Sequence, residues 1–203
     1  MKNTLYYFVD PMCSTCYGYT KELTRIREQL NTKIDFEIIV GGLRPHGTET
    51  IKEMKSFLTD QWLQIQQQSE VEFNYNILDT CNLKYDTEPA CRAVVTMKKL
   101  KPNLVFDYLK AIQKGFYFHN YSPNEPATFA LQAKEFGVQL IDFLEAFNSN
   151  EIKELTKAEF AFAKKCEIKS LPSLAIEQNG DLMIVAQGIV NHELVLKRIN
   201  SFV

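Results

Sequence analysis

Two cysteines separated by two residues follow a short apolar stretch near the start of this 203-residue chain. The stretch covers Thr4–Val9, and Cys13-Ser14-Thr15-Cys16 then opens a helix-forming segment that extends to about Leu30. Two thiols at such a strand-to-helix junction can close a small disulfide ring. Because a helix N-terminus favours negative charge, Cys13 can ionise near neutral pH and attack a disulfide. Cys16, one turn further along, can then resolve the mixed disulfide. The pattern therefore indicates a redox site.

The order of the expected elements adds a second constraint on the fold. Alternating apolar residues predict a strand over Ile34–Val40, so the chain begins with a strand, a helix and a strand, which implies a parallel pair. Two later strands, Ser173–Glu177 and Met183–Gln187, flank Asn179-Gly180, and Asn-Gly is a strong hairpin signal. A last helix is expected from Asn191 to Phe202, with Asn191 as its N-cap.

From Thr48 to about Cys166 the sequence predicts only helices. The first begins at a capping box formed by Thr50 and Glu53 and extends to Gln68. The others are expected at Pro89–Leu100, Asn103–Phe118, Pro126–Phe136, Leu140–Phe147 and Asn150–Lys165. Without this middle part the chain has a β-α-β unit followed by a β-β-α unit, which is the thioredoxin layout. We therefore expect an α/β thioredoxin-like domain made of residues 1–45 and 167–203, interrupted by a helical insertion domain of residues 46–166.

Composition excludes several classes of partner. A net charge of −2 provides no basic surface for nucleic acid or an anionic membrane. No stretch approaches the 18 or so apolar residues of a membrane span, and Met1-Lys2-Asn3 leads straight into the first strand without a signal segment. We therefore expect a cytoplasmic protein. Five cysteines, an odd number, do not suit a secreted disulfide framework, so the pair at Cys13 and Cys16 points to catalysis or redox sensing.

Two other interpretations of the cysteine pair are weaker. Structural zinc usually needs two close pairs of Cys or His ligands, and no second pair with that spacing is present, so we expect no metal. A purely structural disulfide across two residues closes too small a loop to stabilise much. Cys81, Cys91 and Cys166 are expected to be small buried apolar residues, with a regulatory Cys81–Cys91 disulfide as the less common alternative.

A second site element is expected at Leu171-Pro172-Ser173, which opens the third strand. In the thioredoxin layout this place faces the cysteine pair. A trans bond is the ordinary state of an X-Pro peptide, but the layout favours a cis Leu171–Pro172 bond. The backbone of Leu171 would then be free to pair with a substrate peptide.

The chain resembles the DsbA-like thiol:disulfide oxidoreductases. The resemblance lies in the motif Asp10-Pro11-Met12-Cys13-Ser14-Thr15-Cys16-Tyr17-Gly18, in the helical insertion, and in Leu171-Pro172-Ser173-Leu174. The branch it resembles most is the cytosolic one described as predicted protein-disulfide isomerase, which is related to the FrnE proteins. The segment Thr87-Glu88-Pro89-Ala90-Cys91-Arg92-Ala93-Val94 also resembles a motif of that branch.

The resemblance implies roles for individual residues. Cys13 would be the attacking thiol and Cys16 the resolving thiol, while Leu171, Pro172, Ser14 and Thr15 would contact the substrate. No cofactor is implied. The partners would be proteins or peptides that contain disulfides, with a recycling thiol such as glutathione as a candidate. Members of the family often have Trp where Thr15 and Tyr17 stand, and thioredoxins have a buried acid where Tyr7 stands. The sequence therefore offers no obvious side-chain base, because Asp10 lies next to the turn.

Three functions remain open at this point. The leading hypothesis is a dithiol–disulfide oxidoreductase, whose direction as reductase, oxidase or isomerase depends on a reduction potential that sequence does not give. A glutathione-dependent transferase or isomerase of the kappa-like type shares the inserted layout, but those enzymes typically have Ser where Cys13 stands. A non-catalytic adaptor or redox sensor that binds a partner protein is the third. Fold alone does not decide among them.

Overall fold

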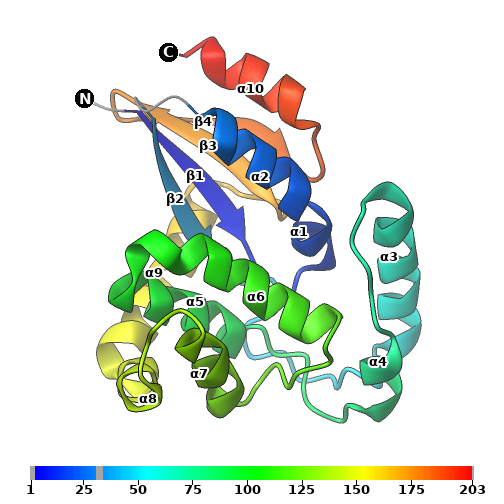
Figure 1. Cartoon of the computed structure of the whole chain (residues 1–203). Coiled ribbons are helices and arrows are strands. Elements are labelled where there is room, and N and C mark those ends of the chain that lie inside the picture. The colour runs from blue at the N-terminus through cyan, green and yellow to red at the C-terminus, as the bar shows by residue number, and fades with distance from the viewer. Residues whose placement is uncertain (1–2, 31–33, 203) are drawn as a thin grey trace.

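The computed structural model describes residues 3–30 and 34–202, and its centre is a four-stranded mixed sheet (Figure 1). The strands are β1 (Asn3–Val9), β2 (Ile34–Val40), β3 (Ser173–Gln178) and β4 (Asp181–Gln187), in the order β2-β1-β3-β4. β1 is parallel to β2 and antiparallel to β3, and β3 is antiparallel to β4. The parallel pair and the hairpin predicted from the sequence are both confirmed.

The hairpin turn follows from its two central residues. Asn179 and Gly180 have φ angles of 56° and 92°, the left-handed conformations that a two-residue hairpin turn requires. Asn and Gly adopt these angles at little cost, so the turn joins β3 directly to β4. β1 is a central strand, and its residues Leu5, Tyr7, Phe8 and Val9 are buried.

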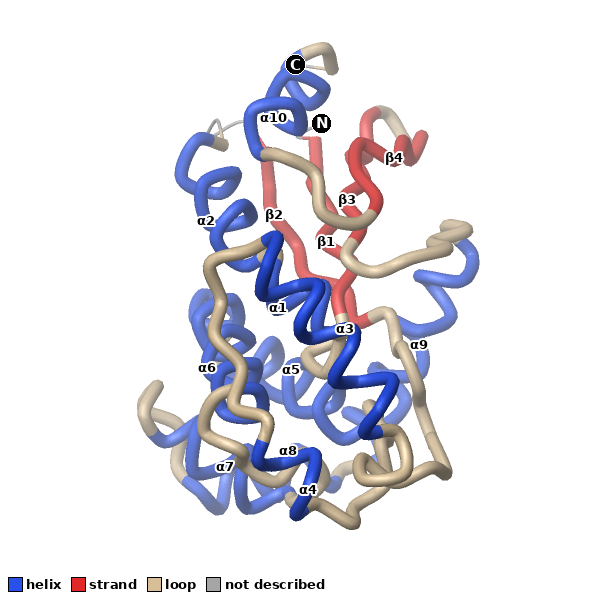
Figure 2. Tube along the Cα trace, turned by 90° about the vertical axis from the view of Figure 1, so that its right-hand side faces the viewer, coloured by secondary structure: helices blue, strands red, loops and turns tan. Residues whose placement is uncertain are grey.

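Helices cover both faces of the sheet. On one side lie α2 (Thr20–Gln29) and α10 (His192–Asn200), and on the other lies α9 (Asn150–Lys165), as Figure 2 shows. α10 is tied to α2 because Glu22 accepts hydrogen bonds from the backbone N–H and Nδ1 of His192, at 2.6 and 2.8 Å. On the other face, Phe8, Ile39, Ala163 and Ala175 form a separate small core under α9.

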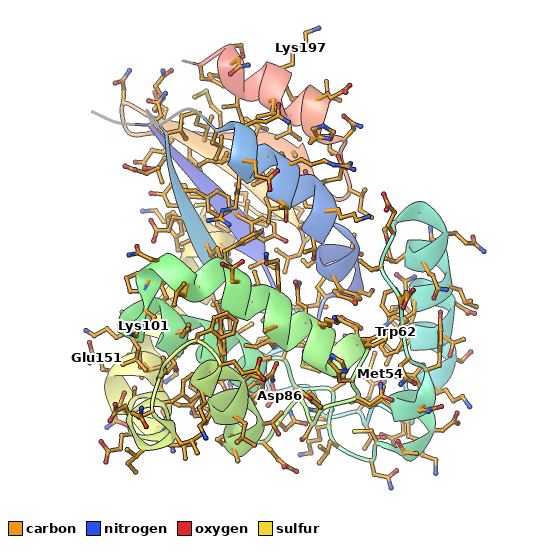
Figure 3. All side chains as sticks on the ribbon, in the orientation of Figure 1. Met54, Trp62, Asp86, Lys101, Glu151 and Lys197 are labelled. Atoms are coloured by element: carbon orange, nitrogen blue, oxygen red, sulfur yellow. The ribbon has the colours of Figure 1, made fainter. Side chains whose placement is uncertain are left out.

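The rest of the chain is a helical region beside the sheet (Figure 1). Its helices are α3 (Lys55–Gln68), α4 (Asn76–Thr80), α5 (Glu88–Leu100), α6 (Val105–Tyr117), α7 (Pro126–Lys134) and α8 (Leu140–Asn148), with a 3-10 turn at Pro102–Leu104. Trp62 projects from α3 toward α6 (Figure 3), where its ring lies 5.2 Å from that of Tyr117. Tyr117 in turn stacks on Tyr17 at 4.8 Å, so this aromatic cluster joins the helical region to the segment that contains the two cysteines.

Three features differ from the prediction, apart from shifts of one or two residues at the ends of other elements. The helix expected from about Cys13 to Leu30 is interrupted at Tyr19, where the Thr20 hydroxyl bonds the Tyr17 carbonyl, and forms α1 (Ser14–Gly18) and α2. The Thr50–Glu53 capping box forms both of its hydrogen bonds, yet the regular helix begins only at Lys55. Residues 49–51 instead bond to the backbone of residues 83–85, which keeps them extended. The five-residue helix α4 was not predicted, because it is too short to show a period.

The division into a domain of residues 1–45 and 167–203 and an insertion of residues 46–166 stays a prediction. α9 belongs to the proposed insertion by sequence, but it packs on β2, and Lys98 and Glu159 bond to the backbone of that strand. Within the described residues, no helix is long and apolar enough to cross a membrane.

Candidate functional site

The two thiols lie where β1 gives way to α1. Cys13 is the N-cap residue of α1, and its backbone N–H bonds to the Asp10 carbonyl at 3.0 Å, which closes the turn after the strand. Cys13 retains 5% of its surface exposed, whereas Cys16, one helical turn further, retains none. Both cysteines are free thiols in this structure. Only Cys13 borders a surface groove, so the thiols differ in their access to a substrate.

The surroundings also separate the two thiols chemically. A hydrogen bond from the Cys16 thiol lowers the pKa of Cys13, and the backbone N–H groups of Thr15 and Cys16 contribute in the same direction. Burial raises the pKa of Cys16 well above that of an ordinary thiol, and the neighbouring Cys13 raises it further. Of the two thiols, Cys13 is therefore the one that ionises more readily, and Cys16 is the one that keeps its proton.

The segment before β3 faces Cys13. The Leu171–Pro172 peptide bond is cis, which confirms the expectation from the sequence. The Cys13 thiol lies 3.7 Å from the Leu171 carbonyl oxygen. Pro172 itself is buried, and its carbonyl accepts a hydrogen bond from the Gly188 N–H at 2.8 Å. The structure thus brings Cys13, Cys16 and Leu171 together, and the buried Pro172 follows Leu171 in the chain.

A groove of about 380 Å³ lies beside Cys13. Ser14, Thr15 and Leu171, three of the residues expected to contact a substrate, line it, whereas Pro172 does not. The remaining wall comes largely from residues that no sequence motif singled out, namely Leu43, Arg44, Met54, Phe57, Leu58, Gln61, Tyr85 and Ser170. Tyr85 is fixed by a hydrogen bond from its hydroxyl to the Met12 carbonyl, next to Cys13. The helical region therefore forms one side of the groove.

Asp10 is a further residue that the sequence analysis did not place in the site. Its side chain is fully buried rather than exposed at the turn. Its carboxylate accepts hydrogen bonds from the Met12 N–H at 2.8 Å and the Leu43 N–H at 2.6 Å. Burial raises the pKa of Asp10, and hydrogen bonds from Leu43, Thr87, Met12 and Cys91 oppose that rise. A buried carboxyl group is thus present near the thiols, although Tyr7 occupies the position where thioredoxins have one.

The other three cysteines lie in different surroundings. Cys91 is buried and its thiol lies 3.4 Å from Asp10 Oδ2, while Cys81 is half-buried at the end of α4. Cys166 is half-buried at the end of α9, beside the small core on the far face of the sheet. All three are free thiols. Residues 3–30 and 34–202 contain no group of three or more His, Cys, Asp or Glu side chains that could hold a metal ion.

A comparison with protein families identifies the family of this chain. Residues 6–186 match the family described as Thioredoxin. The chain belongs to the thioredoxin family. A comparison with curated proteins gives no match. The sheet with its helical insertion is the DsbA-like form of the thioredoxin fold, as the sequence predicted, and this fold supports thiol–disulfide oxidoreductase activity in general.

Solved structures resemble this thioredoxin-family chain over nearly its whole length. A "putative protein disulfide isomerase" from Nitrosomonas europaea is 27% identical, with a TM-score of 0.92 over 99% of this chain and 97% of that one. The cytosolic disulfide reductase DsbM from Pseudomonas aeruginosa is 22% identical, with a TM-score of 0.81 over 98% and 96% of the two chains. The oxidoreductase DsbA from Xylella fastidiosa is 15% identical, with a TM-score of 0.65 over 98% and 83%. The last two similarities concern the fold alone.

Proposed function

We propose that this protein is a thiol–disulfide oxidoreductase whose redox centre is the pair Cys13 and Cys16. The observation that supports this most is the asymmetry of the pair. Cys13 borders a groove and has a lowered pKa, whereas Cys16 is enclosed and has a raised pKa. A nucleophile needs access and a thiolate, and a resolving thiol needs to stay protonated and protected until the mixed disulfide has formed.

The reaction then proceeds in two exchanges. The Cys13 thiolate attacks one sulfur of a substrate disulfide, the substrate S–S bond breaks, and the first substrate thiolate leaves and takes a proton from solvent. Cys16 next attacks Cys13 Sγ and passes its proton to the second substrate sulfur as that group leaves. The Cys13–substrate bond breaks, the second substrate thiol leaves, and a Cys13–Cys16 disulfide remains. The substrate gains two electrons and the protein loses two, so a thiol reductant must restore the dithiol.

The groove indicates what kind of substrate fits. Leu171 offers its backbone beside Cys13, and the partly exposed Ser14 and Thr15 line the same groove. The exposed rings and chains of Phe57 and Leu43 suit the apolar side chains of a protein or peptide that contains a disulfide. Glutathione is the candidate for recycling the pair, since DsbM of P. aeruginosa was solved with GSH.

A cytoplasmic location is part of the same proposal. A thiol pool such as glutathione keeps cytosolic thiols reduced, which suits an enzyme that reduces or isomerises disulfides. The similar DsbM is described as a cytosolic disulfide reductase, and we propose the same direction for this chain.

The test is the glutathione-driven reduction of a protein disulfide such as insulin by the purified protein. We expect catalysed reduction, and a reduction potential below that of protein disulfide isomerase, about −180 mV. Cys13→Ser should reduce the rate to the uncatalysed background. Binding of a folded partner without any turnover would instead support the adaptor, and glutathione transfer to a disulfide-free electrophile would support the kappa-like transferase.

A further inference from the structure

The carboxylate of Asp10 is held by donors from three separate segments of the chain. Met12 N–H comes from the turn before Cys13, and Leu43 N–H comes from the segment after β2. The Cys91 thiol, from α5, lies 3.4 Å from Oδ2, and the Thr87 hydroxyl also bonds to this carboxylate. Two of these donors are backbone amides, which cannot accept a proton in return. Burial raises the pKa of Asp10, and these hydrogen bonds oppose that rise because they stabilise the ionised form of the carboxyl group.

The same carboxylate is linked to the redox centre. Its own backbone carbonyl accepts the Cys13 N–H, and its backbone also hydrogen-bonds to the Cys16 thiol. Because Asp10 is fully buried, its charge is poorly screened by water, and it acts on both thiols. A negative charge at this place opposes formation of a second negative charge on Cys13.

The groups around Asp10 do not cancel this charge. Arg44 is the cation nearest in the chain to the donor Leu43, but its guanidinium forms an ion pair with Glu49 and is partly exposed. Several groups that can become negatively charged face Asp10, Cys13 or Cys16 from neighbouring elements. They are Tyr7, Tyr85, Cys91 and Tyr117, and Glu88 acts on Cys91. None of these groups carries a positive charge. Among the described residues that contact the Asp10 carboxylate, only hydrogen-bond donors stabilise its charge.

We propose that Asp10 is a positioning residue whose buried charge destabilises the Cys13 thiolate and so shifts the Cys13–Cys16 pair toward its disulfide form, which makes the dithiol the stronger reductant. The inference rests on the proposed function and gives a physical reason for its proposed direction as a reductase. The physical basis is that the disulfide has no charge for Asp10 to repel, whereas the reduced pair has a thiolate. Stabilising the reduced form makes such a pair an oxidant, and destabilising it makes the pair a reductant.

Asp10→Asn tests this, with the Cys13–Cys16 pair equilibrated against glutathione. We expect the reduction potential to rise, with a shift of about tenfold in the equilibrium constant, which is 29.6 mV for a two-electron couple. The thiolate absorbance of Cys13 should at the same time titrate at a lower pH than in the unchanged protein. The direction of this change distinguishes an electrostatic effect from a structural one. If the substitution only loosened the site, Cys13 would lose the hydrogen bonds that lower its pKa and would titrate at higher pH.

Two variants serve as matched controls for Asp10→Asn. Cys91→Ser keeps a donor to Asp10 and removes the third thiol, so it should leave the potential within about twofold of the original equilibrium constant. Glu159→Gln neutralises another carboxylate, which accepts the Val40 N–H at 2.7 Å but lies beside β2 and α5, away from the thiols. It should leave the potential unchanged. An equal shift in Glu159→Gln would overturn the assignment to Asp10.

A measurement on the unchanged protein covers the case in which Asp10→Asn does not fold. Because electrostatic coupling is reciprocal, the carboxyl carbon of Asp10, followed by NMR, should titrate at higher pH in the reduced protein than in the oxidised one. The same titration midpoint in both states would refute the proposal. Failure of the pair to exchange with glutathione at all would refute the proposed function, whereas normal exchange with an unshifted Asp10→Asn potential would refute only this inference.

Discussion

The sheet region and the helical region contribute different things to the site. The sheet region supplies the reacting groups, since Cys13 and Cys16 follow β1 and Leu171 precedes β3. The helical region supplies their surroundings, since Phe57 and Tyr85 form a wall of the groove and Cys91 contacts Asp10. The reacting groups lie at the ends of two strands that leave local patterns in the sequence. The surroundings depend on contacts between distant segments, and they determine access, charge and substrate fit.

The largest expected effect concerns cysteines on the two sides of the sheet. Cys13→Ser should lower the rate of protein-disulfide reduction by more than about a hundredfold, to the background, because the thiolate nucleophile is lost. Cys166→Ser changes a half-buried thiol on the far face, whose pKa is raised by burial, and should leave the rate within about twofold. Insulin reduction measures both. Loss of activity in Cys166→Ser would show that the far face takes part in the chemistry.

The strands and the reacting groups could be predicted from the sequence because they leave local patterns. Ile34–Val40 and Asn150–Lys165 were predicted with the bounds that the structure has, since alternation and helical spacing are visible within each segment. The burial of Asp10 was not predicted, because it depends on Leu43 and Thr87, which are 33 or more residues away. The wall of the groove was missed for the same reason. No local pattern in the sequence indicates that Phe57 lines the same groove as Cys13.

The second prediction concerns the free energy of unfolding. It tests how strongly the helical region packs against the segment that contains Cys13 and Cys16. Trp62 is fully buried, and its ring lies 5.1 Å from that of Phe73 and 5.2 Å from that of Tyr117. Trp62→Ala should lower the free energy of unfolding by about 3–5 kcal/mol, because a large cavity is left among these rings. Leu63→Ala, at an exposed position of the same helix, should change it by about 0.5 kcal/mol or less. Urea unfolding followed by circular dichroism compares them.

A third prediction concerns the pH at which Cys13 becomes reactive. Its hydrogen bonds lower its pKa, so the rate of alkylation should rise with pH through a midpoint below about 8.5, the ordinary value for a free thiol. Below that midpoint Cys13 is protonated and the rate falls. Burial raises the pKa of Cys81, so that cysteine should react only at higher pH. Alkylation followed by mass spectrometry resolves the two sites, and the reverse order would contradict the assigned surroundings.

The smallest expected effect concerns substrate fit. Phe57 is 58% exposed at the groove, and Phe57→Ala should raise the KM for a protein disulfide about fivefold through lost apolar contact, while reduction of a small aromatic disulfide stays nearly unchanged. Leu131 on α7 is also 58% exposed but lies outside the groove, so Leu131→Ala is the matched control. Equal KM values in all three proteins would remove the helical region from substrate recognition.

The most direct test of the account is to trap the mixed disulfide, since the unequal roles of Cys13 and Cys16 are its central claim. Each cysteine is changed to Ser in turn, the variant is incubated with oxidised glutathione or a protein disulfide, and the adduct is located by mass spectrometry. The account predicts that Cys16→Ser accumulates an adduct on Cys13, because nothing resolves it, and that Cys13→Ser accumulates none, because Cys16 is enclosed and protonated. Equal adducts in both variants, or an adduct on Cys16 alone, would contradict it.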